Sequence, residues 1–334
     1  MTEPKRHFPP PPPLVSRPPG LWRRTPPAIF PPVMGLLGLG LGWRLLGVFL
    51  PGTPVPELAE AALGGIALLY AFCAVAWLAK PLRRPGVVIE ELQILPGRAG
   101  VVASVLCLSL LASVLVPYAP AAALVMVAVA SALLLVLGVL VLWVLAHGPE
   151  EGRTVTPVFH LVFVGHVLAP LTLVPLGYTA LSAAILTVTM LVALSIWVAS
   201  AVQLWRRVPP APLRPLLAIH LAPASLGASI SAMLGWADWA QGFAMLALAI
   251  LTALIVSGRW LLEAGFSPLW GALTFPLAAC ATAILLVFGG HMAGLVLGSL
   301  LLVAGTALTA TVALRVMKAW AKGDLAARTN AASV

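Results

Sequence analysis

Ten long apolar blocks, each bounded by proline, glycine or charged residues, dominate this 334-residue sequence. A bilayer core of roughly 30 Å needs about 20 such residues for each helical span. Hydrophobic residues make up 61% of the chain and charged residues only 9%, and a soluble fold could not bury that much apolar surface. The sequence therefore predicts an all-α integral membrane protein.

The blocks predict ten transmembrane helices arranged as five helical hairpins. Two divisions rest on short breaks, Val116–Pro120 and Pro175–Tyr178. We place them there because an unbroken helix of about 45 residues would overshoot the membrane about twofold at 1.5 Å per residue. The predicted spans are 28–50, 58–79, 99–117, 119–145, 155–176, 178–204, 213–234, 239–257, 268–288 and 291–316.

Lysine and arginine predict the orientation. Of the 19 basic residues, all but Arg44 fall in tails and loops that ten spans place on one face. Loops rich in these residues stay in the cytoplasm. We therefore expect a bacterial inner-membrane protein with a cytoplasmic, Pro/Arg-rich tail over 1–27, a membrane domain over 28–316 and a cytoplasmic C-terminal tail over 317–334.

Mid-span prolines occur only in the first helix of a hairpin, at Pro31, Pro32, Pro170, Pro223 and Pro276. Proline removes a backbone donor and bends a helix, and the freed carbonyl needs cover from protein or water. The pattern predicts five inner helices around a central axis, with straighter second helices outside them. The alternative is that prolines are simply more frequent in membrane helices.

The charges narrow the function classes. The net charge of +9 is spread over many membrane-boundary loops, which argues against nucleic-acid binding. The acidic residues fall at span ends or in loops, which disfavours a carboxylate-driven cation carrier and suits a conduit for anions. No set of nucleophile, base and orienting group recurs at a shared depth, so we do not expect an enzyme.

Three segments resemble a known family. Pro26–Leu36 followed by Trp43 is similar to that family's opening helix, Leu221–Ala224 to its alanine–proline helix, and Leu269–Ala278 to its tryptophan-to-proline motif. The family is the tellurite-resistance and C4-dicarboxylate transporters, which includes bacterial TehA proteins and plant slow anion channels. The resemblance covers nearly the whole chain.

The resemblance implies a quasi-fivefold ten-helix bundle that assembles as a homotrimer, with one pore in each protomer. It also implies that Phe275 gates the pore and that Gly35 leaves room for the ring. Ordinary helix packing is the alternative for both residues. The further positions expected to contact the gate or line the pore are Pro32, Pro170, Pro223, Thr274 and Pro276.

Four polar residues within or near the spans each have more than one possible role. Arg44 either attracts anions into an outer vestibule or extends to the outer headgroups. His160, His166 and His220 line the pore, respond to pH, bind metal or join helices by hydrogen bonds. Their spacing fits no zinc motif, so we expect neither a metal site nor a cofactor.

The leading hypothesis is therefore an anion channel for small inorganic anions or dicarboxylates, embedded in membrane lipid. The alternative is a secondary carrier that exports tellurite or sulfite, or that moves C4-dicarboxylates with protons. A carrier needs alternating access around a mid-membrane site, and the five-hairpin pattern lacks an inverted repeat. A histidine-ligated haem or copper protein ranks third.

Overall fold

The computed structural model describes residues 20–148 and 150–333, and the regular elements in this part of the chain are all helical. Residues 1–19 of the predicted cytoplasmic tail, with their proline run at 9–13, lie outside the described residues. Nine helical segments in the described part are long and apolar enough to cross a membrane. They are α1 (Phe30–Phe49), α2 (Val55–Leu78), α4 (Leu95–Leu115), α5 (Pro120–His147), α7 (Thr179–Arg206), η6 with α8 (Ala211–His220 and Leu221–Met233), α9 (Ala237–Val256), α11 (Gly271–Phe288) and α12 (Met292–Ala321).

The fifth predicted span is present but is not a continuous α-helix. It consists of a π-helical turn, η4 (His160–Val164), a 3-10 turn, η5 (Gly165–Leu168), and the short α6 (Pro170–Leu173). Gly165 lies so close to α4 that a Cβ atom there would be 2.7 Å from a methyl carbon of Leu106. Single π turns of this kind often mark functional positions in a helix.

The helices are interrupted at both of the short breaks that divide the predicted spans. α4 ends at Leu115 and α5 begins at Pro120. Between α6 and α7 the chain turns at Gly177, whose φ of +88° is a backbone conformation that other residues rarely adopt. The prediction of five consecutive hairpins is therefore confirmed.

The helices form an inner and an outer ring. In the odd-numbered long spans, 61–78% of the residues in the most apolar window are buried, against 22–28% in the even-numbered ones. α1 packs against α4 and α11, α11 packs against α8, and the broken segment η4–α6 closes the ring between α8 and α4. The proline pattern predicted this division, because each proline-interrupted span belongs to the inner ring.

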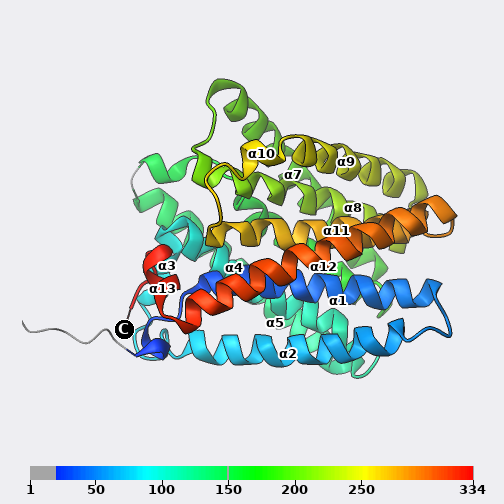
Figure 1. The fold of residues 1–334 in the computed structure, drawn as a ribbon, viewed down its shortest axis with the longest axis horizontal. Helices are drawn as coiled ribbons and strands as arrows, with labels where there is room; N and C mark the ends of the chain where they lie inside the picture. Colours follow the sequence, from blue (N-terminus) through cyan, green and yellow to red (C-terminus); the bar gives the residue numbers. More distant parts are fainter. Residues whose placement is uncertain (1–19, 149, 334) are drawn as a thin grey trace, which may run out of the picture.

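Three short helices lie at one end of the bundle. α3 (Val87–Gln93) and α10 (Gly258–Leu261) connect spans, whereas α13 (Asp324–Arg328) follows the last span. The start of the described chain and its C-terminal end also lie together at this end, beside α3 and α13 (Figure 1). The helix α12 continues five residues beyond the predicted span end, to Ala321.

Candidate functional site

A cavity of about 70 Å³ lies inside the ring, and every one of the five inner segments contributes to its wall. Within the described residues, His160 is the only polar side chain of the lining; the others are aliphatic, aromatic, proline or glycine. The lining residues are Ala28, Pro31, Met34, Pro96, Ala99, Leu106, His160, Leu161, Val164, Gly165, Val167, Leu168, Leu216, Ile219, Ala222, Pro223, Leu226, Pro268, Leu269, Gly271, Ala272, Phe275 and Pro276.

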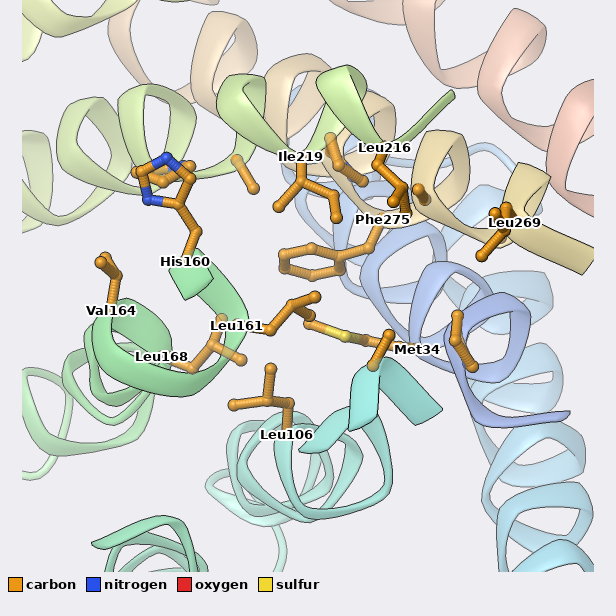
Figure 2. Close-up of a pocket in the computed structure, with 18 of the residues that line it drawn as sticks. Met34, Leu106, His160, Leu161, Val164, Leu168, Leu216, Ile219, Leu269 and Phe275 are labelled. Carbon is orange, nitrogen blue, oxygen red and sulfur yellow. The ribbon is translucent and has the colours of Figure 1, made fainter. Parts of the chain in front are cut away.

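Phe275 occupies the middle of this cavity. Its ring projects from α11, with Ile219 on one side and Leu161, Met34 and Leu106 on the other (Figure 2). Only 6% of the residue is exposed, so the ring fills the cavity instead of facing an open channel.

The glycine beside the aromatic ring is Gly38, not Gly35. A Cβ atom at Gly38 would lie 2.9 Å from Cδ2 of Phe275, whereas one at Gly35 would lie 2.4 Å from Cβ of Thr274. Both glycines let α1 approach α11 closely, and the difference of three residues is about one helical turn. Gly35 therefore contacts the residue that precedes the ring.

Thr274 ties α11 to α1 behind the cavity wall. It is fully buried, and its hydroxyl lies 2.7 Å from the carbonyl oxygen of Gly271 and 3.1 Å from that of Pro31. The hydroxyl has one hydrogen, which these two oxygens share. The Gly271 carbonyl belongs to α11 itself, so the contact with Pro31 is the one that joins α11 to α1, one residue before Phe275. Thr274 thus positions the aromatic residue without lining the cavity.

The expected prolines divide into two groups. Pro223 and Pro276 line the cavity, together with Pro31. Pro32 and Pro170 are buried in the wall but do not line it.

Two of the histidines form a pair between inner segments. Nε2 of His160 lies 2.9 Å from Nδ1 of His220, and the backbone carbonyl of His220 accepts a hydrogen bond from Trp197 Nε1. His160 faces the cavity, whereas His220 lines a groove on the outer side. His166 instead contacts the Ser131 carbonyl at 3.2 Å. Among the described residues there is no cluster of three metal-ligating side chains.

Arg44 does not stand free in an outer vestibule. Its guanidinium contacts both carboxylate oxygens of Glu60, at 2.5 and 2.6 Å, and donates a third hydrogen bond to the Val114 carbonyl. Tyr118 donates its hydroxyl to the same carboxylate at 2.6 Å. The positive charge is therefore compensated locally, which differs from both expectations for this residue.

A buried ion pair at the arginine-rich end was not recognised in the sequence, where its members served only as topology signals. Nζ of Lys80 lies 2.5 Å from Glu91 and donates to the Thr25 carbonyl at 3.0 Å, and neither charged side chain is exposed. Burial lowers the pKa of Lys80 and raises the pKa of Glu91, while their mutual attraction opposes both changes.

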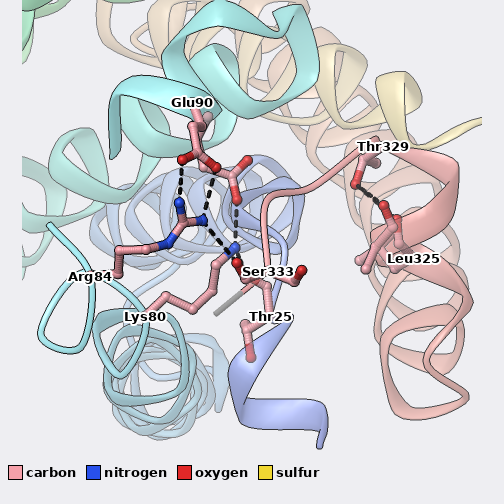
Figure 3. Close-up of polar contacts among 9 residues, drawn as sticks. Thr25, Lys80, Arg84, Glu90, Leu325, Thr329 and Ser333 are labelled. Atoms are coloured by element: carbon pink, nitrogen blue, oxygen red, sulfur yellow. Dashed lines mark hydrogen bonds and ion pairs between the residues drawn. The ribbon is translucent and has the colours of Figure 1, made fainter. Parts of the chain in front are cut away.

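The C-terminal end of the described chain lies beside this pair. Arg84, which forms an exposed ion pair with Glu90, donates a hydrogen bond of 2.9 Å to the Ser333 carbonyl (Figure 3). The loop after α2 therefore contacts Thr25 before the first span and Ser333 after the last one.

A family model described as voltage-dependent anion channel matches residues 24–317, which include all ten spans except the last residues of α12. The search of curated proteins gave no match.

Proposed function

Since this chain belongs to the voltage-dependent anion channel family, we propose that it conducts small anions through the cavity enclosed by its five inner segments, with Phe275 as the gate. One observation carries this proposal: the Phe275 ring fills the centre of a cavity to which every inner segment contributes. Removing this ring would join the spaces on its two sides.

The chemistry of the lining supports anions over cations. Within the described residues, no carboxylate lines the cavity, so no fixed negative charge would repel an anion. Two acidic residues of the described chain are paired with cations away from the cavity, in Arg44–Glu60 and Lys80–Glu91. Apolar constrictions gate channels by excluding water, which suits a phenylalanine closure.

The orientation and assembly belong to the same proposal. We place the arginine-rich end, with both chain ends, in the cytoplasm of a bacterium, because basic loops are retained on that side. We further propose a homotrimer in which each protomer has its own pore. Light scattering of the purified protein in detergent tests this assembly, and a monodisperse monomer would contradict it.

Anion currents across membranes that contain the purified protein test the function. We expect small currents from the wild-type protein and large, anion-selective currents from Phe275→Ala in chloride and nitrate gradients. Phe288→Ala is the matched control, because Phe288 lies at the far end of the same helix and outside the cavity lining. We expect this variant to behave as wild type.

The same preparation separates a channel from a carrier. If neither wild type nor Phe275→Ala conducts, while labelled malate, sulfite or tellurite uptake depends on a proton gradient, the channel proposal is wrong. Equal currents from Phe275→Ala and wild type would leave conduction in place but remove Phe275 as its gate.

A further inference from the structure

A long apolar groove lies between the outer helices α7 and α9, with a volume of about 1040 Å³. It follows α7 from Leu186 to Leu204, which is about 27 Å at 1.5 Å per residue. This length is close to the hydrocarbon thickness of a bilayer, roughly 30 Å. Trp239 borders one end and Trp260 the other, as tryptophans do at the two membrane interfaces.

A second pocket of about 500 Å³ adjoins the groove at the arginine-rich end. The two share Ser200, Leu204 and Leu217 in their walls, so they form one continuous depression. The second pocket differs in character, because its lining includes Arg98, Arg206, Arg207, Gln203 and Thr156.

Arg98 is the most informative of these residues. It is only 4% exposed, and its Nε donates to the Leu92 carbonyl at 2.9 Å. Within the described residues, none of the four ion pairs includes it. A buried guanidinium without a carboxylate is costly, so the pocket that it lines calls for an anion.

Other groups in the same pocket also fit an anionic ligand. Arg206 and Arg207 are exposed, and neither has an acidic partner within 4 Å among the described side chains. The hydroxyls of Thr156 and Ser200 are buried, and no hydrogen-bond partner is present for them in the described part of the chain. Three cations and two hydroxyls therefore converge on one space.

We propose that an acidic phospholipid occupies this depression, with its phosphate against Arg98, Arg206 and Arg207 and its acyl chains along the α7–α9 groove. A soluble anion would satisfy the arginines but leave the groove empty. A second copy of the chain would cover the groove but bring no identified anion to the arginines. Only a ligand with an anionic head and apolar chains matches both parts.

Native mass spectrometry of the purified, delipidated protein tests this site. We expect phosphatidylglycerol to bind more tightly than phosphatidylcholine with the same acyl chains. Arg206→Gln/Arg207→Gln should weaken phosphatidylglycerol binding about thirtyfold, the effect expected for two arginines near an anionic surface, and leave phosphatidylcholine binding unchanged. Arg259→Gln is the matched control, because Arg259 is exposed on α10 but lines neither pocket.

A groove-filling variant tests the acyl-chain part separately. Ala253→Trp places a large side chain in the groove and outside the basic pocket, so it should weaken the binding of both lipids. Retained binding in this variant would contradict the proposed position of the chains.

Three other results would overturn the proposal. The first is equal binding of the two lipids by wild type, or no difference between wild type and Arg206→Gln/Arg207→Gln. The second is displacement of phosphatidylglycerol by equimolar glycerol 3-phosphate, which would show a site for soluble anions. The third is efficient cross-linking between protomers through Leu194→Cys without bound lipid, which would identify the groove as an interface between copies.

Discussion

Removing either charged side chain of the buried pair Lys80–Glu91 should destabilise the protein strongly. At an N···O separation of 2.5 Å, and with an effective dielectric constant of about 20, their attraction is worth about 7 kcal/mol. Desolvation offsets much of this gain, at several kcal/mol for each ion. Removal of one partner leaves an uncompensated buried charge, which costs about 3–5 kcal/mol.

The assay is a double-mutant cycle on the apparent Tm in detergent. We expect Glu91→Leu and Lys80→Met each to lower the Tm by roughly 5–10 °C. The double variant Lys80→Met/Glu91→Leu should recover most of this loss, because two apolar side chains carry no desolvation cost. Glu90→Gln is the control, since the Arg84–Glu90 pair in the same loop is exposed and should contribute little.

Additive losses in the double variant would refute the reasoning. They would mean that each side chain stabilises the protein through separate contacts, such as the Lys80–Thr25 hydrogen bond, and that the charges are not coupled. A Glu91→Leu variant as stable as wild type would refute it equally, since Lys80 would then tolerate burial without a counterion.

Three further predictions concern pH, the gate and the outer vestibule. In Glu91→Leu, thermal stability should rise as the pH approaches 10. Burial lowers the pKa of Lys80, so the folded state loses the Lys80 proton at a lower pH than the unfolded state does. A Tm that does not change between pH 8 and 10 would contradict this. Gly38→Ala should raise basal anion current about tenfold by crowding the Phe275 ring in its closed position, and Gly38→Ala/Phe275→Ala should conduct no more than Phe275→Ala alone. Glu60→Gln should raise the anion current at low ionic strength, because it leaves the Arg44 charge without its carboxylate, whereas Arg44→Gln should not raise it. Equal currents from the two variants would show that the Arg44 charge has no effect on anion entry.

The spans and the two rings could be predicted because few physical rules determine them. Bilayer thickness sets the length of each apolar block, and proline marks helices that need cover from other protein segments. The buried odd-numbered spans with a mid-span proline follow this rule. α4 has no mid-span proline, and its inner position follows from the alternation alone.

The residue contacts of the site depend on helix register, which apolar patterning does not determine. Whether Gly35 or Gly38 lies beside Phe275 depends on how α1 slides along α11, and the Thr274 hydroxyl and the prolines settle that position. The π turn at His160 is a similar case, because the sequence of that span signals a break only at Pro170.

One missed contact did leave a signal in the sequence. Arg44 is the one basic residue away from the arginine-rich face, and Glu60 lies in the next span of the same hairpin, near the end opposite that face. Opposite charges at the same depth of one hairpin are expected to pair, because an isolated charge there is costly. The pair Lys80–Glu91 has no such signal, since a loop rich in both charges allows many pairings.

In the proposed channel, the contact between His160 and His220 limits how the pore can open. Their two facing nitrogens, 2.9 Å apart, share a single hydrogen, and separating them would strand two polar groups in apolar surroundings, at about 1–3 kcal/mol each. The segments η4 and η6 are therefore expected to move together as one rigid body. Widening is then expected at the joint between α1 and α11, where the two helices meet through Gly35, Gly38 and the Thr274 hydroxyl.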